Sequence, residues 1–197
     1  MKELLIVGTG GFAREVYWHA HNSLGYGTEF IIKGFLEGNV PLDHSKYGLL
    51  PAQVLENVLN YKISRNDVFV LALANSKLKE LLAGMIESNG GEFINLIHKT
   101  AMVSDTAKLG IGIILCQFTS ISCNTVVGNH AMLNAYSSLG HDAEIGNYSS
   151  IMGHVDITGN VSVGTHTFWG SGSRALPSSK IGNYATVGAG SVVIRKV

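Results

Sequence analysis

Residues 127–146 read VGNHAMLNAYSSLGHDAEIG, and an aliphatic residue occupies every sixth position of this stretch. These residues are Val127, Leu133, Leu139 and Ile145. The register extends in both directions, because an aliphatic residue followed by glycine recurs once in every three hexapeptides. The five pairs are Leu109-Gly110, Val127-Gly128, Ile145-Gly146, Val163-Gly164 and Ile181-Gly182. A period of six predicts a triangular coil of three short strands, with the aliphatic residue inside the prism.

A second register supports this interpretation, since the position four residues after each aliphatic position is small in nearly every repeat. It is held by Thr119, Thr125, Ala131, Ser137, Ala143, Ser149, Val155, Val161, Thr167, Ser173, Ser179, Ala185 and Ser191. An ordinary antiparallel sheet would instead show a period of two and hairpin turns. The repeat therefore predicts a parallel β-helix, with five coils from its five steps of three hexapeptides.

The first half of the chain alternates strand and helix patterns, which is typical of a small parallel α/β domain. Strands are expected at 4–7, 30–36 and 67–74, and helices at 12–24, 51–59 and 76–88. A glycine-rich turn, GTGG at 8–11, separates the first strand from the first helix. We therefore expect a Rossmann-like α/β domain over residues 1–92 and an all-β helix domain over residues 93–197.

The composition narrows the class of protein. Hydrophobic residues make up 46% of the chain and charged residues 14%, which favours a folded, core-forming protein over disorder. The formal net charge is zero, so the basic footprint of a nucleic-acid binder is missing. Two cysteines are too few for a disulfide framework. The sequence has no apolar stretch of about 20 residues, which a membrane-spanning helix would need. These features predict a cytoplasmic protein with a small-molecule or protein partner.

Four motifs carry a resemblance to a known family: GTGGFAREV at 8–16, ALANS at 72–76, NLIHKTAMVS at 95–104 and LGHDAEIG at 139–146. With the hexapeptides, they resemble the hexapeptide-repeat acyltransferases. The similar subfamily contains N-acetyltransferases of nucleotide-linked 4-amino sugars and sialic-acid O-acetyltransferases. The resemblance implies a left-handed β-helix, a homotrimer, acetyl-CoA as co-substrate and a nucleotide-linked amino sugar held by the N-terminal domain.

His141 and Asp142 are the candidate catalytic residues. The acceptor must lose a proton as it attacks the thioester, and an imidazole can accept that proton near neutral pH. By resemblance, the catalytic His-acid pair of the family falls on His141-Asp142. Asn134, seven residues earlier, is either a substrate-binding partner or a structural corner residue. Relatives often carry a second histidine nine residues after the first, where this chain has Ser150, and His154 is a possible substitute.

The glycine turn can hold phosphate with backbone N–H groups at a helix N-terminus. The same turn also occurs in NAD enzymes, but an attached β-helix disfavours that function. The resemblance assigns the turn to a nucleotide sugar, with these substrate-binding candidates: Gly8, Gly10, Gly11, Phe12, Glu37, Ala74 and Asn75. It also suggests positions where the backbone can approach acetyl-CoA closely. These cofactor-binding candidates are Ser150, Gly159, Gly172, Ser173, Gly188 and Ala189.

Three other functions are weighed against amino-sugar N-acetylation. Sugar O-acetylation would use the same base and cofactor, and a non-catalytic β-helix would only bind a nucleotide sugar. A zinc enzyme built on a β-helix would space its histidines by whole coils, each of three hexapeptides. The successive spacings of His130, His141, His154 and His166 all fall well short of one coil. No metal is therefore expected.

Overall fold

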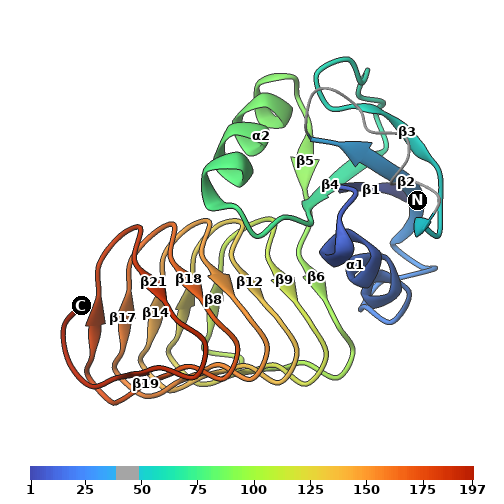
Figure 1. Cartoon of the computed structure of the whole chain (residues 1–197). Coiled ribbons are helices and arrows are strands. Elements are labelled where there is room, and N and C mark those ends of the chain that lie inside the picture. Colours follow the sequence, from blue (N-terminus) through green and yellow to red (C-terminus); the bar gives the residue numbers. More distant parts are fainter. Residues whose placement is uncertain (39–48) are drawn as a thin grey trace. The chain divides into compact units, whose positions relative to one another are not determined.

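The computed structural model describes residues 1–38 and 49–197, which form two compact units, Met1–Ile94 and Asn95–Val197 (Figure 1). The first unit contains a parallel sheet in the order β3-β2-β1-β4-β5. Its strands are β1 Lys2–Val7, β2 Phe30–Glu37, β3 Val54–Asn57, β4 Asp67–Leu71 and β5 Glu92–Phe93. Its helices are α1 Gly11–His21 and α2 Ser76–Ser88.

Two neighbouring inner strands of this sheet, β1 and β4, have continuous runs of buried residues. Residues 4–7 of β1 and 67–71 of β4 are all buried, as expected for strands covered on both faces. Helix α1 contributes buried Ala13, Val16 and Ala20, which share one helical face. The Rossmann-like α/β domain predicted from the strand and helix patterns is confirmed.

One predicted element is wrong. Residues 51–59 do not form a helix, because Val54–Asn57 form strand β3, paired with Phe35–Glu37 of β2. The apolar spacing at 54, 55, 58 and 59 fits a helical face, but β2 would otherwise leave backbone donors and acceptors unpaired at the sheet edge. Helix α1 also ends at His21, with Asn22 as its C-cap, instead of reaching residue 24.

The second unit is a parallel β-helix made of three sheets, with six, six and five strands (Figure 1). The first sheet contains β6 Leu96–Ile97, β9 Ile114–Leu115, β12 Met132–Leu133, β15 Ser150–Ile151, β18 Phe168–Trp169 and β21 Thr186–Val187. The second contains β7 Met102–Val103, β10 Ser120–Ile121, β13 Ser138–Leu139, β16 Asp156–Ile157, β19 Arg174–Ala175 and β22 Val192–Val193. The third contains β8 Lys108–Leu109, β11 Val126–Val127, β14 Glu144–Ile145, β17 Ser162–Val163 and β20 Lys180–Ile181.

The six-residue period sets the core of the β-helix. Each strand pairs with the strand at the same place in the next coil, as in Leu139 with Ile157, and the inward positions form one hydrophobic cluster. Trp169 replaces an aliphatic residue there and is fully buried. The coil predicted from the repeat is confirmed, and its first two strands, β6 and β7, precede the first aliphatic-glycine pair at Leu109. Ile97 and Val103 already pack against the cluster without a following glycine, so the aliphatic-glycine pairs did not mark them.

The corners between strands have their own six-residue register, because one residue at each corner from Gly112 to Gly190 has a positive φ. Side chains at the same corner therefore stack from coil to coil. The His130, Tyr148, His166 and Tyr184 rings form one ladder, with centroids 4.6–5.3 Å apart. The predicted small positions are also confirmed, as Ala131 and Ser149 are fully buried beside the corners.

Candidate active site

His141 and Asp142 stand at the corner between β13 and β14. Their side chains are 58% and 47% exposed, and His141 Nδ1 lies 2.8 Å from Asp142 Oδ2. A carboxylate can only accept, so Nδ1 carries the hydrogen of this bond and Nε2 of the neutral ring keeps its lone pair. Hydrogen bonds from His141 and then from Asn124 hold the pKa of Asp142 below its usual value. The pair therefore presents an oriented base at the surface.

Two neighbours of this pair are contributed by the coils on either side. Asn124 lies one coil earlier, and its Nδ2 donates to Asp142 Oδ1 at 3.2 Å. Gly159 lies one coil later, directly under the imidazole: a Cβ built on it would be 2.5 Å from His141 Nε2. Sequence reasoning did not find Asn124, although its place one full coil before Asp142 was the available signal.

Cys123 stands at the same corner as His141, one coil earlier, and its thiol is free and exposed. The His141 ring lies over Gly159 in the following coil, so Nε2 faces away from the coil that carries Cys123.

Asn134, His154 and His166 occupy other corners of the β-helix than the catalytic candidates. Asn134 and His141 are at opposite ends of β13, and Asn134 Oδ1 accepts from the Ala135 backbone N–H at 2.7 Å. His154 stacks on Tyr136, with parallel rings 4.9 Å apart, at that other corner. His166 stacks between two tyrosines of the long ladder. The structure thus gives His154 and His166 a place in stacked corners.

The candidate cofactor-binding residues differ in exposure. Gly172, Gly188 and Ala189 are exposed, so their backbones are open to a ligand. Ser150 and Ser173 are fully buried, and the Ser173 hydroxyl donates to the Gly170 carbonyl at 2.7 Å. Gly159 is covered by His141, as described above. The role of all six in binding acetyl-CoA stays a prediction.

In the α/β unit, the glycine turn meets the end of β2. Gly8 has φ +122°, and a Cβ there would lie 2.9 Å from the Ala72 carbonyl oxygen. Its N–H donates to the Leu36 carbonyl at 2.8 Å. The Thr9 hydroxyl donates to the buried Glu37 carboxylate at 2.5 Å, which ties the turn to this strand. Thr9, inside the GTGG motif, was missed as a functional candidate.

The remaining substrate candidates lie at the same carboxyl edge of the sheet. Ala74 and Asn75 follow β4, and the Asn75 side chain caps α2 by accepting from the Leu78 N–H at 3.0 Å. Because β1 and β4 are neighbours whose connections run in opposite directions, their ends flank the topological switch point of the sheet. Ligands of parallel α/β sheets bind at such points. Gly10, Gly11 and Phe12 begin α1 beside it.

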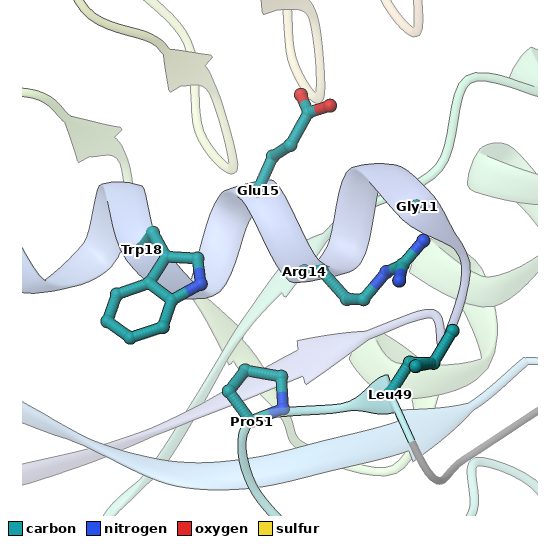
Figure 2. Close-up of a pocket in the computed structure, with 6 residues that line it drawn as sticks. All are labelled: Gly11, Arg14, Glu15, Trp18, Leu49 and Pro51. Atoms are coloured by element: carbon teal, nitrogen blue, oxygen red, sulfur yellow. The ribbon is translucent and has the colours of Figure 1, made fainter.

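A hollow of about 480 Å³ lies along α1 (Figure 2). It is lined by Gly11, Arg14, Glu15, Trp18, Leu49 and Pro51. Arg14 and Trp18 extend toward the side of the helix where Leu49 and Pro51 lie, and Glu15 points away (Figure 2). Arg14 was not a candidate from the sequence, yet its guanidinium lies beside Gly11 at the helix N-terminus. A guanidinium group and a helix N-terminus side by side can bind an anion.

Within residues 1–38 and 49–197, no three His, Cys, Asp or Glu side chains come together as a metal site. None of the helices in this part of the chain is long and apolar enough to cross a membrane.

The fold and site define a class of protein: a small parallel α/β unit followed by a parallel β-helix with a surface His–Asp pair. The fold, without regard to the His–Asp pair, is shared with solved acetyltransferases and fits the left-handed β-helix of hexapeptide-repeat acyltransferases. A histidine variant of perosamine N-acetyltransferase from Caulobacter crescentus, in complex with CoA and GDP-perosamine, matches with a TM-score of 0.87 and 23% identity. The match covers 100% of this chain and 90% of that one.

Other comparisons agree with this class. The acetyltransferase domain of PglB from Neisseria gonorrhoeae, in complex with acetyl coenzyme A, matches with a TM-score of 0.87 and 22% identity over 100% of this chain and 92% of that one. In sequence, GDP-perosamine N-acetyltransferase of Escherichia coli O157:H7 is 32% identical over 105 residues, which is 53% of this chain. The match spans about half of that curated relative, 48% of its length. No family model matches the chain.

Proposed function

We propose that this protein is an acetyl-CoA-dependent N-acetyltransferase that acts on the 4-amino group of a nucleotide-linked sugar. One observation carries the proposal: His141 is oriented by Asp142 at an exposed corner of a β-helix whose fold is that of solved acetyltransferases. Similarity to a GDP-perosamine N-acetyltransferase supports the acceptor class. Structures of relatives with CoA, acetyl coenzyme A or GDP-perosamine support the two substrates.

The proposed chemistry is a direct transfer. The acceptor nitrogen attacks the thioester carbonyl, so that the N–C bond forms and the C–S bond breaks. Nε2 of His141 accepts the proton that the nitrogen loses, and CoA leaves as the thiol or thiolate. Asp142 keeps Nδ1 protonated and stabilises the imidazolium that forms. Holding both substrates together supplies much of the acceleration.

For the nucleotide sugar, we propose the carboxyl edge of the α/β sheet. The Gly8–Gly11 turn and the N-terminus of α1 would hold the diphosphate, with Arg14 as a neighbouring cation. The Thr9–Glu37 hydrogen bond fixes an acceptor carboxylate close to this turn. Glu37 can therefore bind a base or ribose hydroxyl, as the resemblance implied.

The test is release of thiol from acetyl-CoA with a panel of UDP-, GDP- and dTDP-linked 4-amino sugars. We expect turnover with one of the amino sugars, and at least a hundredfold loss of kcat in His141→Ala with unchanged substrate binding. Unchanged turnover in the variant would remove His141 from the chemistry. Binding of both ligands by the wild-type protein without any turnover would favour the non-catalytic alternative.

Sugar O-acetylation is the second candidate, and one comparison favours it. An acyl-carrier-protein–UDP-N-acetylglucosamine O-acyltransferase of Sinorhizobium fredii is 35% identical over 69 residues. This match covers 35% of the present chain and 26% of the relative. Hydroxyl acceptors, including sialic acid, belong in the same panel. Turnover with these alone would replace N-acetylation by O-acetylation.

A further inference from the structure

The His141–Asp142 pair is contacted from the coil before it and from the coil after it. Asn124 and Asp142 occupy the same corner in successive coils, with φ of 56° and 57°. The Asn124 side chain reaches Asp142 Oδ1, while Oδ2 binds His141. On the other side, the imidazole rests against the bare Cα of Gly159. Both neighbours therefore touch the pair without being part of it.

We propose that Asn124 and Gly159 are positioning residues for the catalytic pair. Asn124 fixes the carboxylate of Asp142, and Gly159 forms the surface on which the His141 ring lies. The inference rests on the proposed function, because positioning His141 matters for catalysis only if His141 accepts a proton from the acceptor. Asn124 was not among the candidates predicted from the sequence. Gly159 was predicted there as a residue that binds acetyl-CoA.

Asn124 is needed because an exposed carboxylate turns easily about its last torsion, which has broad energy minima. A single bond to His141 leaves that rotation open, since Asp142 is about half exposed. A second bond to the other oxygen selects one orientation. The backbone that carries Asn124 is fixed, because the Asn124 N–H donates to Thr106 Oγ1 at 2.9 Å and the Asp142 N–H donates to the Cys123 carbonyl at 3.0 Å.

Gly159 is needed because no side chain fits between its Cα and the imidazole. An added Cβ would lie 2.5–2.6 Å from Nε2 and Cε1 of His141, well inside van der Waals contact. The ring would have to swing away, and the Nδ1–Asp142 bond would be lost or bent. Misplacement of a catalytic group by about 1 Å can cost up to a hundredfold in rate.

The test of Asn124 is Asn124→Gly, because glycine accepts the positive φ and removes only the side chain. We expect kcat to fall about tenfold, with KM values for both substrates nearly unchanged. The matched control is Asn160→Gly, at the same corner in the coil after Asp142, with φ 59° and an exposed side chain. It should turn over like wild type. Equal kcat in Asn124→Gly and wild type would overturn this half of the proposal.

A titration of the Asp142 carboxylate by NMR, without substrates, gives a readout that does not depend on activity. The Asn124 hydrogen bond is one cause of the lowered pKa of Asp142. We therefore expect this pKa to rise in Asn124→Gly and to stay at its wild-type value in Asn160→Gly. If the pKa of Asp142 rises in Asn124→Gly but the wild-type protein shows no turnover, the Asn124–Asp142 contact stands and the proposed function is rejected. If the pKa does not rise, the positioning role of Asn124 is rejected.

The test of Gly159 is Gly159→Ala. If Gly159 supports the ring, kcat falls about tenfold or more while KM for acetyl-CoA stays near wild type, and the imidazole NMR signals of His141 shift. If Gly159 instead admits the pantetheine arm, KM for acetyl-CoA rises and the imidazole signals of the free protein stay in place. The second result would overturn this half of the proposal.

Discussion

Glycines at the corners of the β-helix differ in what surrounds their Cα atoms. A Cβ on Gly146 would lie 2.6 Å from the Gly164 carbonyl carbon and the Thr165 nitrogen, which belong to the backbone of the next coil. On Gly153 the nearest atom would be the Ala135 carbonyl oxygen at 3.4 Å, an ordinary contact. The first glycine is therefore required by coil stacking, and the second is not.

We expect Gly146→Ala to lower the free energy of unfolding by about 1–3 kcal/mol, because the stacked coils must separate or shift. The matched control, Gly153→Ala, should change it by less than about 0.5 kcal/mol. Thermal unfolding monitored by circular dichroism measures both, with roughly 2–4 °C in Tm per kcal/mol for a chain of this size. Equal stability of the two variants would contradict the steric argument.

The residues of the candidate site differ in how far the sequence could predict their contacts. His141 and Asp142 are adjacent in sequence, so their pairing needed only a corner that lets both side chains leave the prism. Asn124 and Gly159 reach them from other coils, and the repeat gave the spacing but not the side-chain directions. Asn134, which the sequence left open as a substrate-binding partner or a corner residue, stands at the other end of β13.

At the scale of elements, an ion cluster joins three strands of the α/β sheet. Lys33 of β2 lies 2.7 Å from both Glu3 of β1 and Asp67 of β4. Tyr61 OH and the Ser64 N–H donate to the other Asp67 oxygen at 2.9 and 2.7 Å. The Asp67 side chain is fully buried. The cluster thus satisfies a buried carboxylate at the start of β4.

Burial alone would raise the pKa of Asp67, but the hydrogen bonds from Lys33, Ser64 and Tyr61 outweigh it and lower the pKa. The folded state therefore binds this proton less well than the unfolded chain, whose Asp pKa is about 3.9. The resulting stabilisation is present above pH about 4 and is lost as the pH falls through the folded pKa.

We expect Asp67→Asn to lower the free energy of unfolding by about 3 kcal/mol at pH 7, because Lys33 loses a charged partner. The difference from wild type should shrink as the pH falls below about 4, because the unfolded chain then takes up a proton on Asp67 while the folded state still resists it. Urea unfolding at pH 7, 5 and 3 measures this. A difference that stays constant over this range would show that the charge of Asp67 does not matter. Lys2→Gln is the control, because its bond to Glu92 is exposed and should contribute little.

Helices and strands could be predicted where the local sequence pattern alone decides the structure. Residues 76–88 have a helical pattern and an Asn75 cap, and α2 has those bounds. Residues 51–59 have a similar apolar spacing, yet Val54–Asn57 pair with β2. Pairing at a sheet edge depends on a partner strand that is distant in sequence, which local periodicity does not contain.

At the scale of the whole molecule, apolar side chains remain on the outer faces of the β-helix. Met102 is 72% exposed and Val192 is 55% exposed, and both belong to the sheet of β7 and β22. They lie on the two edge strands of this sheet, and the strands between them present Ser120, Ser138, Asp156 and Arg174 at the same position. We propose the homotrimer that the family resemblance implied, a closed cyclic assembly of identical chains.

Light scattering after size-exclusion chromatography should therefore give three times the 21.0 kDa mass of one chain. Met102→Glu should shift the mass toward one chain, because a charge on that face costs burial energy, whereas Lys108→Glu on another face should not. A wild-type mass equal to that of a single chain would exclude the trimer and leave the fold unchanged. Cytoplasmic localisation likewise stays a prediction.

The sequence by itself determined the β-helix, the α/β unit before it and the His141–Asp142 pair, because each depends on spacing along the chain. An inward residue must recur every six positions to fill a triangular prism, so the pattern and the fold imply each other. Only the tertiary structure decided which side chains meet across coils and across the sheet. The Asn124 bond, the Gly159 surface and strand β3 all join residues distant in sequence, and their geometry depends on side-chain directions and backbone pairing that no local pattern specifies.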